Sequence, residues 1–191
     1  LIGKVKRFIN IASCSPEDQY IRLMMTFQNE AKSEICIDKL NNLNINSMNI
    51  LKKEFIRSPK QDFQNRLLYV DVKRYLPDDL LVKMDIATMA NSLEARSPFL
   101  DHKLMEFAAT IPPKFKLNGF DKKYILKKAL LPILPKEIVY RKKQGFGVPI
   151  GDWLRNDLYS YASDILLDQR AISRGYFRTD KLKNILSLHL S

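Results

Sequence analysis

Apolar residues recur every three or four positions through almost the whole chain, and this spacing constrains its fold more than any other feature. Glycine, which disfavours helix interiors, supplies only 6 of the 191 residues. The sequence shows no pattern of strands in a parallel sheet. It therefore predicts a mainly α-helical chain, an all-helical piece folded as a single unit over residues 1–191.

Capping residues and prolines mark where the predicted helices begin and end. Ser15 before Pro16 is typical of a helix start, because serine can cap and proline suits the first helical position. Pro77 is expected to separate two helices, and Asp101 is placed as an N-cap. The predicted helices cover residues 15–31, two short pieces within 34–56, 61–75, 78–92, 101–111, 121–131, an amphipathic stretch at 150–168 and a last helix capped by Thr179.

The composition is that of a soluble globular protein, with 46% hydrophobic and 28% charged residues. No apolar run approaches the roughly 20 residues of a membrane-spanning helix, and the first ten residues show no secretory signal. Cys14 and Cys36 stand alone, which gives no disulfide framework or zinc cluster and favours a reducing cytoplasm. The chain begins with Leu1 and ends inside a helical pattern, so we expect it to be a fragment.

The net charge of +11 allows three interpretations. A basic surface can bind nucleic acid, or it can serve a polyanionic small molecule such as a nucleoside triphosphate. The third is a lysine-rich, well-solvated surface, which the asparagine-rich segment NNLNINSMN also favours. Aromatic residues alternate with lysines at 114–128, but this is weak support for nucleic acid because lysines on a helix face are usually just solvated.

Asp85 lies among apolar helical neighbours in the segment LLVKMDIATMA. Leu81, Val82 and Met89 share its predicted face, where an ionised carboxylate is costly unless it is paired or hydrogen-bonded. It can be a ligand-site carboxylate with a tuned pKa, or a structural aspartate that bonds backbone groups or a lysine. Composition alone favours the structural interpretation.

Glu94 and Arg96 lie two residues apart at the end of this helical pattern, in the segment NSLEARSPFLDH. In an extended chain both side chains point the same way. They can form an ion pair that orients the turn, or they can face a zwitterionic ligand together. The guanidinium would then bind an α-carboxylate and the carboxylate an α-ammonium. Spacing alone does not choose between these interpretations.

Residues 141–149, RKKQGFGVP, form a basic loop with two glycines. Lys143 comes just before Gly145 and Gly147, and glycines allow a backbone to approach a ligand closely. Such a loop suits phosphates, or an oxyanion that forms in a transition state. The Walker spacing of a phosphate-binding loop is absent, and a solvated basic turn is the alternative.

Two ordered motifs in this chain resemble the synthetase domain of glutamine-dependent asparagine synthetases. They are YLPDDLLVKMDIATMANSLEARSPFLDHKLMEFAATIP and, further along the chain, RKKQGFGVPIGDWLR. The resemblance is strongest over residues 70–155. It implies that the chain is the truncated, helical C-terminal part of an α/β synthetase domain of the ATP-pyrophosphatase type.

The resemblance also implies a reaction. The family joins an N-terminal glutaminase to the synthetase domain. ATP, accompanied by magnesium, activates the β-carboxylate of aspartate as an adenylate, pyrophosphate leaves, and ammonia derived from glutamine attacks the acyl carbon. We therefore expect a carbon–nitrogen ligase that uses ATP and Mg²⁺ as cofactors and takes aspartate and glutamine-derived ammonia as substrates. We also expect a cytoplasmic location, and a homodimer is a possible assembly.

Residue by residue, the resemblance implies the following roles. Lys143 matches the family's catalytic lysine, placed against the pyrophosphate and the oxyanion. Glu94 and Arg96 match the motif beside the aspartate pocket, where they position substrate and Glu94 is also a candidate base. Asp85 matches an acidic position on the preceding helix. Family members often carry arginine directly after it, whereas this chain carries Ile86, which puts a salt bridge there in doubt. Lys83 is a candidate to meet the substrate carboxylate.

Several family motifs do not occur in these 191 residues: the Ser-Gly-Gly-x-Asp-Ser phosphate loop, a later glycine-rich acidic motif and the N-terminal cysteine nucleophile of the glutaminase. The chain alone is therefore expected to be unable to catalyse the overall reaction. One alternative is a relative that amidates another carboxylate, for instance on a surface polysaccharide. Others are a basic helical nucleic-acid-binding module, whose binding would weaken steeply with salt, and a helical remnant that only binds partners.

Overall fold

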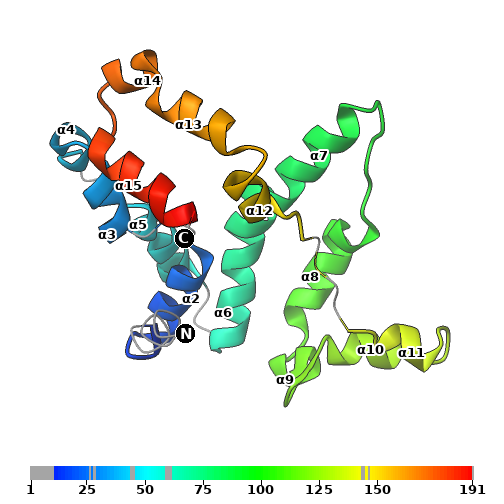
Figure 1. Cartoon of the computed structure of the whole chain (residues 1–191). Coiled ribbons are helices and arrows are strands. Elements are labelled where there is room, and N and C mark those ends of the chain that lie inside the picture. Colours follow the sequence, from blue (N-terminus) through cyan, green and yellow to red (C-terminus); the bar gives the residue numbers. More distant parts are fainter. Residues whose placement is uncertain are drawn as a thin grey trace. The chain divides into compact units, whose positions relative to one another are not determined.

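Helices make up most of the computed structural model, which describes residues 11–190 apart from 26, 28, 44, 45, 59–61, 143, 144 and 146. Figure 1 labels them in chain order. Contacts divide the chain into two compact units, the first formed by Leu1–Ile50 with Gly145–Ser191 and the second by Leu51–Gln144. The prediction of a mainly helical chain is confirmed, since the described residues hold one two-stranded sheet beside the helices. That the two units act as one domain stays a prediction.

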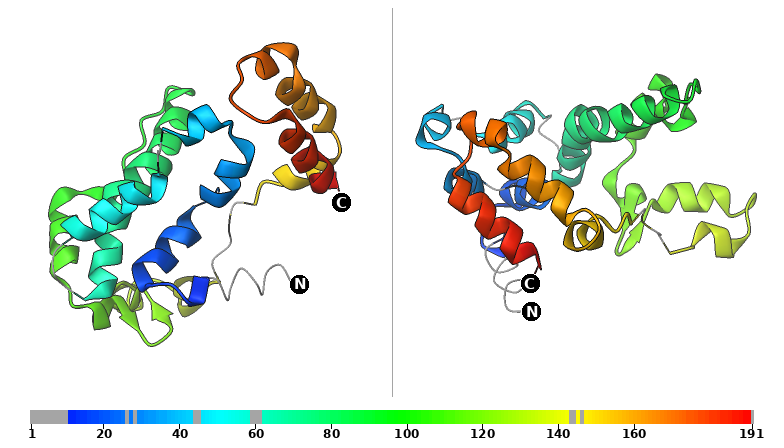
Figure 2. Two further views of the ribbon diagram at one scale, coloured as in Figure 1. Left: turned by 90° about the vertical axis from the view of Figure 1, so that its left-hand side faces the viewer. Right: turned by 45° about the horizontal axis from the view of Figure 1, so that its top comes forward.

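In the first unit, segments from both halves of the sequence fold together. Helix α15 packs against α3, α12 and α13, and Figure 2 shows α15 beside α13 from two further sides. An antiparallel bridge joins Cys36 to Phe177, and the Arg178 guanidinium donates to Asp38 Oδ1 at 2.6 Å. The helices of this unit are α2 (Pro16–Met24), α3 (Asn29–Ile35), α4 (Asp38–Asn41), the start of α5 (Ser47–Arg57), α12 (Ile150–Arg155), α13 (Tyr159–Leu167), α14 (Gln169–Ser173) and α15 (Thr179–Leu190).

In the second unit, three helical segments follow one another without a break, and Figure 1 shows them as one rod from α6 to α7. They are α6 (Phe63–Val70), the π-helix η1 (Asp71–Leu81) and α7 (Val82–Met89). The remaining elements are η2 (Pro98–Leu100), α8 (His102–Thr110), α9 (Pro113–Lys116), β1 (Leu117–Asn118), β2 (Asp121–Lys122), α10 (Tyr124–Leu130) and α11 (Lys136–Val139).

The expectation that Pro77 separates two helices is wrong. Pro77 lies inside η1, and the backbone stays helical on both sides of it. In an α-helix, proline removes a hydrogen bond and its ring meets the carbonyl of the residue four positions earlier. A π-helix pairs each N–H with the carbonyl five positions earlier, so that carbonyl is not required to face the ring. The π-helical turn is the physical reason that the rod continues.

Two further predicted helices are interrupted. The helix expected over 15–31 ends early because Met25 adopts extended backbone, and a new helix begins at Asn29. The amphipathic stretch at 150–168 forms two helices, since Asn156 leaves helical backbone with φ −119° and ψ −99°. In both cases the apolar periodicity carries on across the break, which is why the sequence pattern did not reveal it.

A short hairpin replaces the start of the helix predicted over 121–131. Leu117 pairs with Lys122 and Asn118 with Asp121 across the two strands. Gly119 takes φ 59° in the turn between them, a left-handed conformation that glycine adopts without steric cost. The expectation of an all-helical chain is therefore wrong at this one place in the described residues.

The predicted caps at Ser15 and Asp101 are confirmed, whereas Thr179, also predicted as a cap, is the first residue of its helix, α15. Ser15 Oγ accepts a hydrogen bond from the Asp18 N–H at 3.2 Å, at the start of α2. Asp101 Oδ1 accepts from the N–H groups of Lys103 and Leu104, at 3.0 and 3.1 Å, at the start of α8. Each cap satisfies backbone donors that a helix start leaves without an intrahelical partner.

Few side chains are buried in either unit. Ile21, Ile35 and Cys36 are buried in the first unit, and Phe55 and Val70 in the second. Many large apolar side chains are exposed, including all those of α7. None of the helices among the described residues is both long and apolar enough to cross a membrane.

Candidate functional site

Helix α7 ends in a tight reversal that releases the chain into an extended segment. The Leu93 N–H donates to the Thr88 carbonyl at 3.0 Å, and the Ser92 N–H donates to the Met89 carbonyl at 2.9 Å. This pair of bonds is the Schellman pattern of a helix C-terminus. Ser92 occupies the position usually taken by glycine and has φ 56°. The sequence did not signal this motif, because a serine rarely fills that position.

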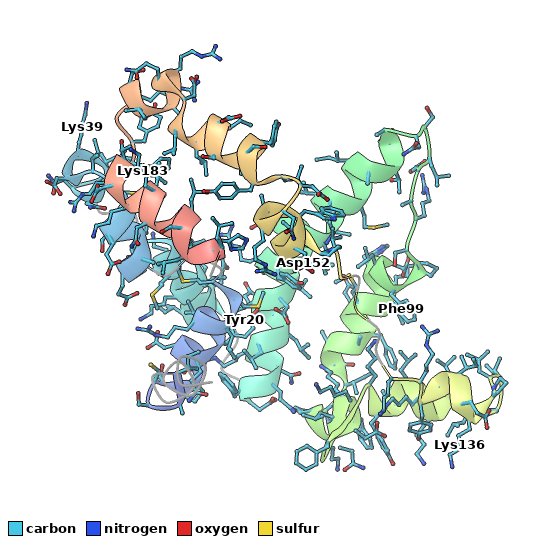
Figure 3. The ribbon with its side chains drawn as sticks, in the orientation of Figure 1. Tyr20, Lys39, Phe99, Lys136, Asp152 and Lys183 are labelled. Carbon is cyan, nitrogen blue, oxygen red and sulfur yellow. The ribbon has the colours of Figure 1, made fainter. Side chains whose placement is uncertain are left out.

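Glu94 and Arg96 lie in the extended segment that follows, and they form an ion pair. Arg96 Nη2 lies 2.8 Å from Glu94 Oε1, and the two side chains are 84% and 67% exposed. The prediction that both side chains point the same way is confirmed. Because exposed ion pairs contribute little to stability, on the order of 0–1 kcal/mol, this one can open toward a ligand at small cost. Phe99, labelled in Figure 3, lies in η2 just after the segment.

Asp85 and Lys83 lie on α7, and both are exposed. The apolar neighbours predicted around Asp85 are present, but Val82 and Met89 are themselves about half exposed, at 49% and 54%. In the described part of the chain the Asp85 side chain is thus exposed, which does not match the structural interpretation of a buried aspartate. Lys83 Nζ lies 3.9 Å from Asp79 Oδ1. A substrate role for Asp85 and for Lys83 stays a prediction.

Lys143 lies outside the described residues, so its placement stays a prediction. Around it, Arg141 and Lys142 are exposed. A Cβ added at Gly145 or at Gly147 would meet no atom within 4 Å. The described part of the chain therefore gives neither glycine a steric reason. The close approach of a ligand and a solvated basic turn both remain predictions for this loop.

The start of this basic loop is tied to the rest of the second unit. Lys127 Nζ lies 4.9 Å from the centroid of the Tyr140 ring, directly before the loop, and also pairs with the Asp121 carboxylate of β2. The lysine is thus held by a cation–π contact and an ion pair at once. Sequence reasoning missed this contact because its three residues come from the hairpin, α10 and the end of α11.

A second Glu–Arg pair, also missed from the sequence, lies in the same unit, with its glutamate buried and its arginine partly exposed. Arg74 of η1 donates to Glu54 Oε1 of α5 from Nη2 at 2.5 Å and from Nε at 3.1 Å. Glu54 is only 4% exposed. The hydrogen bond from Arg74, opposed by burial, lowers the pKa of Glu54 below its ordinary 4.5, and the same bond raises the pKa of Arg74. Arg57 Nη1 lies 3.5 Å from the same oxygen.

The chain matches the family described as Asparagine synthase over residues 6–191. It belongs to the asparagine synthase family. It is 34% identical over 177 residues to the glutamine-hydrolyzing asparagine synthetase 1 of Bacillus subtilis, covering 92% of this chain and 27% of that protein. The glutamine-hydrolyzing asparagine synthetase 3 of the same organism is 40% identical over 83 residues, 44% of this chain and 13% of that protein. Amidase chyE of Penicillium rubens is 30% identical over 115 residues, 56% of this chain and 17% of that protein.

The chain thus spans about a quarter, 27%, of the length of the glutamine-hydrolyzing asparagine synthetase 1 of Bacillus subtilis. No solved structure matches it. Within the described residues, no group of three or more His, Cys, Asp or Glu side chains is placed to hold a metal ion.

What the described site offers chemically is an anion and a cation side by side in water, at the end of a helix. An exposed guanidinium keeps free N–H donors beyond the one that faces Glu94, and a carboxylate has a second oxygen. Together they can bind the two charges of an amino-acid head group, which no single side chain can do. The ion-pair interpretation of the motif is therefore confirmed, and the interpretation that Glu94 and Arg96 face a ligand stays a prediction.

Proposed function

We propose that the protein is a glutamine-hydrolysing asparagine synthetase, which amidates aspartate through a β-aspartyl-adenylate and releases AMP and pyrophosphate. The observation that carries the proposal is the exposed Glu94–Arg96 pair, held in a chain that matches the family over residues 6–191. The names of the two Bacillus subtilis relatives support the choice of reaction. ATP and Mg²⁺ are the cofactors that this reaction uses.

In the proposed reaction Arg96 binds the α-carboxylate of aspartate through its planar fork, and Glu94 binds the α-ammonium or accepts a proton from the attacking ammonia. Lys143 stabilises the leaving pyrophosphate and the oxyanion of the tetrahedral intermediate, since a fixed cation lowers the energy of charge that develops there. Asp85 and Lys83 complete the substrate-binding set from α7, with Lys83 toward the substrate carboxylate. The 191 residues without a phosphate loop are not expected to turn over by themselves.

The proposed location is the cytoplasm, where Cys14 and Cys36, neither of which is in a disulfide bond, would stay reduced. A homodimer is part of the proposal. A nucleic-acid partner is not part of it, because lysines on a helix face are usually just solvated.

The test is pyrophosphate release by the complete gene product supplied with ATP, Mg²⁺, glutamine and aspartate. We expect release that depends on aspartate and is accompanied by asparagine. Lys143→Met should lower kcat by about a hundredfold or more, as expected when an oxyanion-stabilising group is removed. The matched control is Lys136→Met, an exposed lysine on α11 that lies outside the proposed site and is labelled in Figure 3.

Absence of release with aspartate would contradict the proposal. The acceptor would then be another carboxylate, such as one on a surface polysaccharide. The similarity to a protein named as an amidase is the observation that keeps this second candidate in view. A panel of carboxylate acceptors in the same pyrophosphate assay separates the two.

A further inference from the structure

The π-helix η1 is unusual in its length and in its position. It runs for 11 residues, from Asp71 to Leu81, and contains Pro77. π-Helical pairing is rare, mostly limited to single turns, and is frequently found at functional sites. Here it connects α6, which is tied to the end of α5, with α7, which leads into the Glu94–Arg96 segment. An unfavourable backbone form of this length needs support from outside the helix.

That support comes from α5. Two of the three donor nitrogens of the Arg74 side chain, Nη2 and Nε, donate to Glu54 Oε1 at 2.5 and 3.1 Å, and the carboxylate is buried. Arg74 is three residues before Pro77, so the tie holds the segment just upstream of the proline. One turn on, Arg74 Nη1 lies 3.8 Å from Asp78 Oδ2. The same arginine therefore contacts a neighbouring helix and the turn that follows it.

A second tie fixes the start of the rod. Arg66 Nε donates to Ser58 Oγ at 3.1 Å, and Nη2 donates to the Phe55 carbonyl at 3.3 Å. Its guanidinium carbon lies 5.7 Å from the centroid of the Phe55 ring. This tie holds α6 against the end of α5 before the π-helix begins. Beyond Arg74, by contrast, α7 has no buried residue. The direction of α7 is therefore set upstream, at η1.

We propose that Arg74 is a positioning residue: through its bond to Glu54 it keeps η1 in the π-helical form, and so determines where α7 delivers the Glu94–Arg96 pair. A change from π to α pairing alters the number of residues per turn, which rotates everything that follows. An α-helix through Pro77 would also place its ring against the Lys73 carbonyl and kink. Either change redirects α7. The consequence for aspartate binding rests on the proposed function.

Hydrogen exchange of the complete gene product tests the backbone half of the proposal. In Arg74→Met, amides of residues 78–92 should exchange about tenfold faster than in the wild type, because the π form loses its outside support. The matched control is Arg57→Met. Arg57 lies beside the same Glu54 carboxylate, but at 3.5 Å and with 66% of its side chain exposed. Its removal should leave exchange over 78–92 within about twofold of the wild type.

Kinetics test the functional half. Arg74→Met should raise KM for aspartate about tenfold and leave KM for ATP within about twofold, since only the Glu94–Arg96 side of the site moves. Arg74→Lys keeps the charge but loses the planar guanidinium. Its KM for aspartate should therefore lie between those of the wild type and Arg74→Met. A purely structural role would lower the melting temperature and the active fraction without separating the two KM values.

Wild-type exchange over 78–92 in Arg74→Met would overturn the proposal, even if the melting temperature falls. If that variant does not fold, Arg74→Lys and Glu54→Gln carry the same measurement, and wild-type exchange in both would overturn it equally. If the wild type releases no pyrophosphate with aspartate, the proposed function fails, and the exchange comparison alone decides the role of Arg74.

Discussion

Two Glu–Arg pairs in the second unit have the same chemistry and opposite surroundings. Glu54 and Arg74 lie on different helices, and their side chains are 6% and 37% exposed. Glu94 and Arg96 lie two residues apart in an extended segment, and theirs are 67% and 84% exposed. In the first pair the arginine donates two hydrogen bonds to one carboxylate oxygen, whereas in the second a single contact of 2.8 Å joins the two side chains.

The difference in exposure determines what each pair can do. A buried carboxylate without its cation is costly, so Glu54 and Arg74 are fixed in place and serve the fold. An exposed ion pair can open to water at little cost in free energy. Glu94 and Arg96 can therefore give up their mutual contact and bind a ligand in its place. Substitution in the second pair should therefore affect substrate use alone, whereas substitution in the first should lower stability and, through η1, also weaken aspartate binding.

The largest effect is expected for Glu94→Gln in the complete gene product. It keeps the shape of the side chain but removes the charge that the proposed function assigns to the α-ammonium or to proton transfer. We expect kcat/KM for aspartate to fall about a hundredfold, the scale on which misplaced or missing substrate contacts act. The melting temperature should stay within about 1 °C, because the group is exposed. Pyrophosphate release and a thermal melt measure the two. A large loss of stability with normal turnover would mean that the exposed pair serves the fold rather than the substrate, and would contradict this prediction.

Arg96→Lys should have a smaller effect of the same kind. Lysine keeps the positive charge but cannot form the planar, two-pronged contact that a guanidinium makes with a carboxylate. We expect KM for aspartate to rise about tenfold while kcat changes much less, since binding rather than chemistry loses a contact. Steady-state kinetics over a range of aspartate concentrations give both constants. An unchanged KM would show that Arg96 only bridges to Glu94.

Glu54→Gln should differ from both by also lowering stability. At neutral pH we expect the melting temperature to fall by about 5 °C, because Arg74 is left beside a neutral, buried partner. The pH dependence has a definite sign. The folded-state pKa of Glu54 lies below its ordinary 4.5, so the pair stabilises the protein above that pH. The contribution is lost as the pH falls through the lower folded-state value.

Thermal melts from neutral pH to acid should therefore bring the wild type and Glu54→Gln together at low pH. Glu94→Gln, measured in parallel, is the control for general acid effects on the protein. A gap between wild type and Glu54→Gln that is the same at every pH would mean that the Glu54 charge does not contribute. Shape or packing would then be the cause.

The same two pairs show how far the sequence could predict this molecule. Glu94 and Arg96 are two residues apart, and the strand period of two was enough to predict that they face the same way. Ser15 and Asp101 were predicted as caps because a cap depends on three or four consecutive residues. Local patterns of this kind are readable without knowing the fold.

Glu54 and Arg74 are 20 residues apart on separate helices, and no local pattern links them. Their meeting depends on η1, which the sequence did not predict because proline in a helical pattern ordinarily signals a break. Ser92 was missed for a similar reason, since a left-handed serine has no sequence signature. The sequence therefore could not predict the backbone conformation that connects one local segment to the next. This conformation decides which charged side chains become buried.

Substitution of Asp101 is predicted to have the smallest effect. It also tests whether the segment that carries Glu94 and Arg96 is independent of helix α8. Its carboxylate caps α8, directly after the segment that carries Glu94 and Arg96. Asp101→Ala should destabilise the protein by about 1 kcal/mol, the usual cost of a lost cap, and Asp101→Asn should recover most of it because asparagine also caps. KM for aspartate should be unchanged in both, because the Glu94–Arg96 contact does not involve the cap. A KM that rises in Asp101→Ala and returns in Asp101→Asn would mean that α8, as well as α7, positions the pair.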